Sequence, residues 1–253
     1  MSGLIVVDHA YRVALWDRLR TFEREALLAA AEESRLYAPP NGDGEAQNDI
    51  AQTIHDIALH LESLSDWELC KTMYRRVLEY PVSLADIHGD ARFRLAVCEE
   101  RQGAYNAAIE AFRESIEGED GTKVALRAHA RVRLARLLMD AEEFAEAMAL
   151  LEQVIPMLPV DQLAAHELWF EVGRCALRLG RAEYAVEVLR RATDAVRGLE
   201  REVEVLRSLA EAYERNQQRT EAVECYRRIV SSGFSEPRTK AAATVRLQSL
   251  GVA

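Results

Sequence analysis

Proline and glycine are scarce in this sequence, with 6 and 12 residues among 253. Both residues interrupt helices, so their scarcity favours long helices joined by short turns. The sequence also has no run of about 18 apolar residues, and we therefore expect no membrane-spanning helix. Its first residues lack a basic leader followed by a long apolar core, so we expect no secretory signal. These absences predict a helical, cytoplasmic protein.

Cysteine and positive charge are also in short supply. The four cysteines, Cys70, Cys98, Cys175 and Cys225, form no CxxC pair and lie within helical patterns. We expect them to be buried, reduced thiols. Lysine and arginine number 32 against 42 aspartates and glutamates, which gives a net charge of −10. Such a charge opposes generic binding to nucleic acids or anionic membranes, unless the basic residues gather in one place.

Motifs for catalysis and for metal binding are absent. No HExxH, GxSxG, P-loop or GxGxxG pattern occurs in the sequence. His55 and His60 are five residues apart, which places them on different faces of a helix and prevents them from sharing a metal. We expect no catalytic residue, no metal and no cofactor, and we predict that the chain is not an enzyme.

A pattern of small residues recurs five times along the chain. The first small residues of the five units are Ala58, Ala96, Ala135, Gly173 and Ala210. Their spacings are 38, 39, 38 and 37 residues, and a second small residue follows each of them after 12 positions. The second small residues are Cys70, Ala108, Ala147, Ala185 and Ala222. This period predicts five stacked helical hairpins, and the constant interval of 12 predicts that all five share one geometry.

Close packing explains why small residues recur at these positions. Two antiparallel helices approach closely only where the side chains at their crossing are small. Gly173 is the extreme case, since glycine inside a helix costs about 1 kcal/mol relative to alanine. We expect Gly173 to face Ala185 and the closer contact of the surrounding large residues to offset that cost.

The fourth unit carries the fullest version of a known pattern. Its residues are Trp169, Val172, Gly173, Ala176, Gly180, Ala185, Leu189 and Ala192. The pattern resembles the tetratricopeptide repeat family over roughly residues 51 to 235. The resemblance implies an all-α fold, a right-handed superhelical solenoid of about five antiparallel hairpins with a helical cap at each end.

Four segments follow from this organisation. We expect an N-terminal helical segment (1–38), a linker (39–49), five repeats (50–235) and a C-terminal capping helix (236–253). The N-terminal segment is either a cap or a separate docking element, and its apolar residues can bury against the first repeat or against a second copy of the chain. In the last helix, Ala241, Val245 and either Leu247 or Leu250 are expected to point inward.

The first helix of each hairpin is expected to line a groove, where exposed residues report on partners. Ten residues of the middle three units are the candidate binding residues: Phe93, Arg94, Arg101, His129, Val132, Arg133, Arg136, Phe170, Arg174 and Arg178. Arginine binds carboxylates in a bidentate manner, and a nearby aromatic or aliphatic surface holds apolar side chains. The alternative is that these arginines pair with glutamates of neighbouring turns.

The sequence therefore predicts a non-catalytic scaffold or adaptor that binds an acidic protein or peptide segment in an arginine-rich groove. A second hypothesis is a regulatory protein in which a bound peptide or ligand changes the curvature of the array and thereby controls an effector. Binding of nucleic acid in the same groove ranks lower, because the net charge of −10 opposes it. Membrane binding is not expected.

Overall fold

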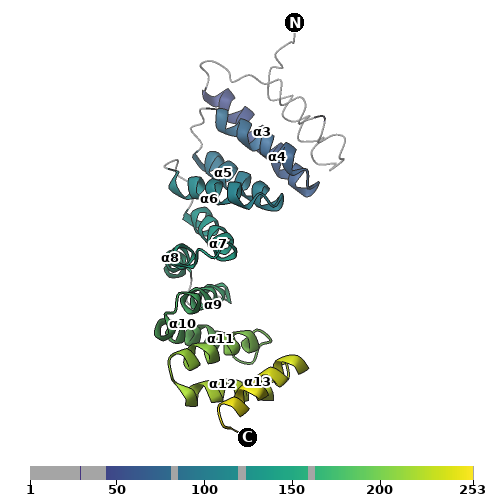
Figure 1. The fold of residues 1–253 in the computed structure, drawn as a ribbon. Helices are drawn as coiled ribbons and strands as arrows, with labels where there is room; N and C mark the ends of the chain where they lie inside the picture. Colours follow the sequence, from purple (N-terminus) through teal and green to yellow (C-terminus); the bar gives the residue numbers. More distant parts are fainter. Residues whose placement is uncertain (1–28, 30–43, 81–84, 119–123, 159–162, 253) are drawn as a thin grey trace. The chain divides into compact units, whose positions relative to one another are not determined.

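The computed structural model of the chain describes residue 29 and residues 44–80, 85–118, 124–158 and 163–252, and every regular element within these residues is helical (Figure 1). The predicted N-terminal segment lies outside the described residues, apart from residue 29. The chain forms two compact units, and the boundary between them falls inside one helix, between Leu134 and Ala135.

Unit 1 holds the first two hairpins. Its described helices are α3 (Gly44–Ser63), α4 (Trp67–Glu79), α5 (Ala85–Arg101), α6 (Tyr105–Glu117) and the first part of α7 (Val124–Asp140). Helix α3 packs against α4, α4 against α5, and α5 against α6, and α3 also touches α5. The core of the first hairpin is apolar, with Ile54, Ile57 and Leu61 of α3 packed among Met73 and Tyr74 of α4.

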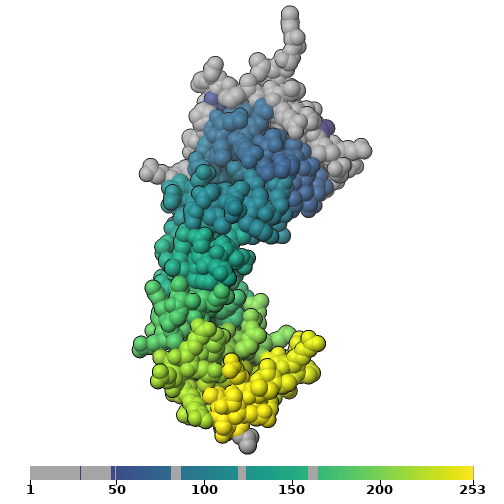
Figure 2. Space-filling view, in the orientation of Figure 1, coloured from purple at the N-terminus to yellow at the C-terminus, as the bar shows by residue number. Residues whose placement is uncertain are grey.

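Unit 2 continues the alternation to the end of the chain. Its helices are α8 (Phe144–Val154), the 3-10 turn η1 (Ile155–Met157), α9 (Leu163–Arg178), α10 (Ala182–Ala195), α11 (Glu202–Arg215), α12 (Arg219–Ser231) and α13 (Pro237–Ser249). Each helix from α8 onward packs against its successor. Figure 2 shows α13, in yellow, at the surface of this unit beside α12.

Two expectations about the ends of the repeats are corrected. Helix α3 begins at Gly44, so the last part of the predicted linker 39–49 is helical. In α13 the side chain that packs inward is Ala243, whereas Ala241 is exposed and Val245 is 61% exposed. The physical reason is that a methyl side chain lets α13 lie close to α12, and this rotation turns the other two apolar residues outward.

The turn inside each hairpin repeats one backbone geometry. In all five hairpins, the residue seven positions after the first small residue has φ between 57° and 75°. These residues are Ser65, Gly103, Glu142, Gly180 and Gln217. The next residue is the N-cap of the second helix. Its carbonyl oxygen accepts a hydrogen bond from the N–H of the second small residue at 2.9–3.1 Å in every hairpin. The constant interval of 12 therefore follows from one turn used five times.

The small residues occupy the closest contacts of the hairpins. Both members are fully buried in four of the pairs, and Gly173 and Ala185 are buried in the remaining one. In the first hairpin the Cys70 thiol reaches the Ala58 carbonyl oxygen at 3.6 Å. All four cysteines are buried free thiols, which confirms the expectation from their sequence context.

Gly173 has a different close neighbour from the one expected. A methyl group built on Gly173 would lie 2.5 Å from both Cγ and Cδ2 of Leu189. Leu189 is fully buried, one turn beyond Ala185, so the glycine makes room for the large residue of α10. The same position, 16 residues after the first small residue, holds Tyr74, Phe112 and Tyr226 in other hairpins.

Replacement of Gly173 by alanine tests this contact. We expect Gly173→Ala to lower the free energy of unfolding by about 1–2 kcal/mol, because crowding against Leu189 outweighs the better helix propensity of alanine. Urea unfolding followed by circular dichroism measures the change. In the Gly173→Ala background, Leu189→Ala should cost less than it does in the wild type. A more stable Gly173→Ala protein would show that the two helices are not in close contact.

The turn geometry gives a second test in which crowding plays no part. Gly180 has φ of +73°, and no atom lies within 4 Å of a methyl group placed on it. Gly180→Ala should therefore cost about 1 kcal/mol through backbone strain alone. Gln217→Gly should have the opposite effect, a gain of about 0.5–1 kcal/mol, because Gln217 holds φ of 61°. If thermal unfolding shows both variants shifted in the same direction, the left-handed turn is not the determinant.

Candidate functional site

A chain of partly buried ion pairs and hydrogen bonds joins the first helices of unit 1. Nε2 of His55 lies 2.7 Å from Oδ2 of Asp90, and the same oxygen accepts from Nε of Arg94 at 2.6 Å. Nη1 of Arg94 donates to both oxygens of Glu62 at 3.1 Å, and the hydroxyl of Tyr74 donates to Glu62 at 2.5 Å. These contacts tie α3, α4 and α5 together, so the guanidinium group of Arg94 is already occupied.

Opposite effects act on the pKa values of this network. Burial lowers the pKa of His55, but its contacts with Asp56 and Asp90 outweigh burial, so the net pKa is raised. Burial raises the pKa of Asp90, but His55 and Arg94 outweigh it, so the net pKa is lowered. Each partner thus favours the charged form of the other.

Arginine–glutamate pairs recur between successive hairpins at equivalent positions. Each arginine stands two residues before the first small residue of its own hairpin. Each glutamate stands four residues after the first small residue of the preceding hairpin. The pairs are Arg94–Glu62 at 3.1 Å and Arg133–Glu100 at 2.6 Å. Arg246 of α13 lies 3.9 Å from Glu214 of α11 and joins the last helix to the fifth hairpin. Two of the predicted binding residues, Arg94 and Arg133, therefore connect neighbouring hairpins.

The aromatic and aliphatic candidates of unit 1 contribute to packing. The ring of Phe93 lies 5.9 Å from the ring of Phe112, so it completes the core of the second hairpin. Val132 is also partly buried. Arg101 is exposed and has no ion pair among the described residues.

His129 lines a cleft of about 400 Å³ in unit 1, together with Gln52 and His55 of α3 and Ile87 and Asp90 of α5. His129 itself is exposed. The wall opposite it is the ion-pair network of His55 and Asp90, so the cleft combines two imidazole groups with an apolar patch.

In unit 2, two of the three predicted arginines have carboxylate partners. Nε of Arg136 donates to Glu171 at 2.9 Å, and Nη2 of Arg178 donates to Glu142 at 3.2 Å. The guanidinium carbon of Arg178 also lies 4.6 Å from the centre of the Phe144 ring. Both pairs join residues of neighbouring hairpins rather than of one helix.

Arg174 differs from the other two arginines. It is exposed, its guanidinium carbon lies 5.8 Å from the centre of the Phe170 ring, and no carboxylate pairs with it among the described residues. Arg174, Arg136 and Arg178 share a cleft of about 440 Å³ with Met139 and Phe144. Three carboxylates also line this cleft: Asp140, Glu142 and Glu171. The guanidinium and carboxylate groups are therefore equal in number.

A neighbouring cleft of about 390 Å³ lies between α9 and α11 and is lined by Phe170, Glu171 and His166, among others. His166 is buried, and neither of its ring nitrogens has a hydrogen-bond partner. Burial, assisted by the charge of Arg201, lowers its pKa, so the imidazole is held neutral.

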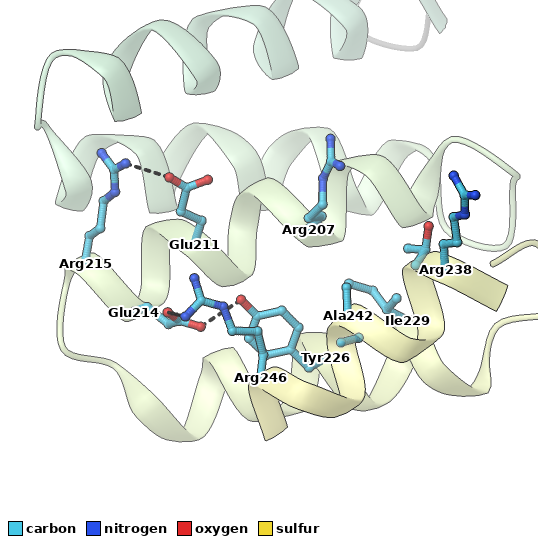
Figure 3. Close-up of a pocket in the computed structure, with 11 residues that line it drawn as sticks. Arg207, Glu211, Glu214, Arg215, Tyr226, Ile229, Arg238, Ala242 and Arg246 are labelled. Atoms are coloured by element: carbon cyan, nitrogen blue, oxygen red, sulfur yellow. Dashed lines mark hydrogen bonds and ion pairs between the residues drawn. The ribbon is translucent and has the colours of Figure 1, made fainter. Parts of the chain in front are cut away.

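The third cleft of unit 2, about 580 Å³, lies between α11, α12 and α13 and is shown in Figure 3. It is lined by Arg207, Glu211, Glu214, Arg215, Tyr226, Ile229, Arg238, Thr239, Ala242, Ala243 and Arg246. Four arginines face two glutamates here, so this cleft has an excess of positive charge in an acidic chain.

The sequence-based candidates do not include Arg207 or Arg238. For Arg238 the sequence offers one signal. Pro237 begins α13, so Arg238 lies in the first turn of a helix, where the helix dipole does not stabilise a cation. Of the expected inward positions of α13, Ala241 and Val245 are exposed, whereas Leu247 and Leu250 are partly buried.

The described residues contain no group of three or more histidine, cysteine or acidic side chains arranged to hold a metal ion. None of the helices in the described ranges is long and apolar enough to cross a membrane.

Three family models, each described as a tetratricopeptide repeat, match residues 55–123, 101–168 and 205–235. Together these matches cover more than half of the chain. The protein belongs to the tetratricopeptide repeat family, in agreement with the pattern of small residues and with the helical hairpins. A comparison with curated protein sequences gives no match.

Several solved structures have a similar fold. The structure of BtubC (BKLC) from P. vanneervenii has a TM-score of 0.57 at 16% identity, over 91% of this chain and 92% of that chain. MamA (residues 41 to end) from Desulfovibrio magneticus RS-1 has a TM-score of 0.54 at 16% identity, over 70% and 92%. A putative kinesin light chain from Podosopora anserina has a TM-score of 0.54 at 19% identity, over 78% and 96%. At these identities the likeness shows the fold alone.

The ion pair of His55 and Asp90 predicts a pH dependence of stability. Because folding raises the pKa of His55, its stabilisation of the fold is complete below pH 6.5, the ordinary pKa. This stabilisation is lost as the pH rises through the pKa that His55 has in the folded protein. Because the pKa of Asp90 is lowered, its contribution is present above 3.8 and is lost as the pH falls through the folded value.

The pair should therefore stabilise the fold most between pH 3.8 and 6.5, the two ordinary values. We expect His55→Gln to destabilise the protein at pH 6, and the difference from wild type to shrink by pH 8. Urea midpoints over this range measure it, with His129→Gln as the exposed control. A difference that does not depend on pH would contradict the charged pair.

Proposed function

We propose that the chain is a non-catalytic protein-interaction scaffold that binds a protein or peptide segment through the exposed side of α9. Membership of the tetratricopeptide repeat family supports binding to proteins, and the arrangement of α9 supports this surface. The observation that carries the proposal is Arg174, which is exposed, stacked near Phe170 and without a carboxylate partner among the described residues. A guanidinium group held beside an aromatic ring is well suited to bind a carboxylate next to an apolar side chain.

The partner segment is proposed to be acidic. Arg178 is already paired, but its side chain is 56% exposed and that of Glu142 is 74% exposed. Exposed pairs of this kind contribute only about 0–1 kcal/mol, so a carboxylate of a partner can replace Glu142 at little cost. Phe144 keeps the guanidinium group of Arg178 in place during that exchange. Arg136 is also half exposed and lies on the same cleft.

The other arginines of the predicted groove have a different role in this proposal. Arg94 and Arg133 fix one hairpin to the next in unit 1, and their side chains are largely covered. Arg101 and His129 are exposed and stay candidate contacts for a partner. A regulatory role and a cytoplasmic location both remain predictions from the sequence.

A site-specific methyl signal tests the α9 surface. Met139 lines the same cleft as Arg174, so its methyl resonance in the full-length chain reports on binding there. The probe is a blocked peptide of alternating glutamate and leucine, titrated into methionine-labelled protein. We expect the Met139 signal to shift, and Arg174→Ala to weaken the Kd read from it by about tenfold or more, because a charge-assisted pair is lost.

The matched control is Arg227→Ala, which removes an exposed arginine of α12 that lines none of the clefts in the described part of unit 2 and should leave the Kd unchanged. A Met139 signal that responds equally to a lysine–leucine peptide would contradict acidic recognition. If a single-stranded oligonucleotide shifts Met139 and the acidic peptide does not, the surface binds nucleic acid instead.

A further inference from the structure

The cleft between α11, α12 and α13 has two ends of different character (Figure 3). At one end both glutamates are already engaged. Nη2 of Arg215 donates to Glu211 at 2.6 Å, and Glu214 accepts from the hydroxyl of Tyr226 at 2.7 Å and lies 3.9 Å from Arg246. These contacts stay within the cleft, so its carboxylates have no further cation to satisfy.

The other end holds Arg207 of α11 and Arg238 of α13. Both side chains are exposed, and neither has an ion pair or hydrogen bond to any described residue. Figure 3 shows the two guanidinium groups extending in the same direction from neighbouring helices, away from the engaged glutamates. Two arginines on one side of a cleft repel each other unless an anion lies between them.

A structural role does not account for these two residues. Arg238 is the second residue of α13, and a cation at the N-terminal end of a helix is disfavoured by the helix dipole. The first turn of α13 contains no acidic residue, and Glu236 at its N-cap makes no ion pair with Arg238. Arg207 stands in α11 among residues that pack well without it, since its neighbours Leu206 and Leu209 are buried.

Apolar side chains form part of the lining of the cleft. Ile229 and Ala243 line it with 1% and 4% of their surfaces exposed, beside the ring of Tyr226 and the exposed methyl group of Ala242. Burial raises the pKa of Tyr226, and its bond to Glu214 adds to this effect, so the phenol stays neutral and donates to the glutamate. A cleft of about 580 Å³ has room for one aliphatic side chain and its neighbours.

We propose that this cleft is a second binding site, separate from the α9 surface, for a partner segment that carries carboxylates beside one aliphatic side chain. The carboxylates pair with Arg207 and Arg238, and the aliphatic side chain packs against the exposed methyl group of Ala242, beside Ile229. Charge complementarity selects this occupant, since the cleft has four arginines and two glutamates in a chain of net charge −10. The inference shares with the proposed function only the class of partner, a protein segment.

The experiment uses the full-length chain labelled at isoleucine and methionine methyl groups. Ile229 reports on this cleft and Met139 on the α9 surface. The probe is a blocked pentapeptide with one leucine between two pairs of glutamates. We expect the Ile229 signal to shift on titration, and the double variant Arg207→Ala/Arg238→Ala to weaken the Kd read from Ile229 at least tenfold. Arg227→Ala should leave it unchanged.

Folding is not at risk in these variants, because both arginines are exposed and make no described contact. Circular dichroism melting curves should show a midpoint no lower than that of the wild type, because Arg238 gains nothing from the dipole of α13. The double variant should leave the Met139 response intact, just as Arg174→Ala should leave the Ile229 response intact. The two sites are thereby tested independently.

Each outcome of the titration either supports or overturns the proposed site. An Ile229 shift with the acidic peptide that is lost in the double variant supports the site, even if Met139 never responds and the α9 proposal fails. An unshifted Ile229 overturns it, and so does an equal shift with a peptide that has glutamines in place of the glutamates. Equal binding by the double variant and the wild type overturns the role of the two arginines.

Discussion

The left-handed turn inside each hairpin is the constraint on which the rest of the structure depends. It stands seven residues after the first small side chain, and the carbonyl that follows it receives the N–H of the second small side chain. This geometry sets where the second helix begins and which side chains meet the first helix. A large residue such as Leu189 or Tyr74 then has a defined place opposite a small one. The turn occurs in all five hairpins, although its residue of positive φ is a glycine in only two of them.

The ion pairs between the first helices of successive hairpins follow from this repeated geometry. When hairpins repeat, an arginine of one unit meets a glutamate of the preceding unit at a constant offset, as in Arg94–Glu62 and Arg133–Glu100. Arginines at these positions stabilise the stack, whereas Arg174, Arg207 and Arg238 have no carboxylate partner among the described residues. An arginine-rich sequence therefore need not mean an arginine-rich binding surface.

The fold could be predicted from the sequence because it rests on local spacing. Small residues at constant intervals and scarce proline were enough to place five hairpins and to recognise the family. The turn at Glu142 and Gln217 was not predictable in this way, because neither residue type favours positive φ. The candidate site was predicted less well. Ion pairs such as Arg136–Glu171 join residues 35 positions apart, and i, i+4 reasoning cannot reveal them. The rotation of α13 around Ala243, which creates the third cleft, depends on packing against α12.

The central claim is that one hairpin geometry is used five times, and the backbone angle at the non-glycine turn residues tests it most directly. Nuclear magnetic resonance measures φ at Ser65, Glu142 and Gln217 through the coupling and the distance between the amide and α protons. The account predicts positive φ at all three residues, as at Gly103 and Gly180. A negative φ at any of them would contradict a single shared turn.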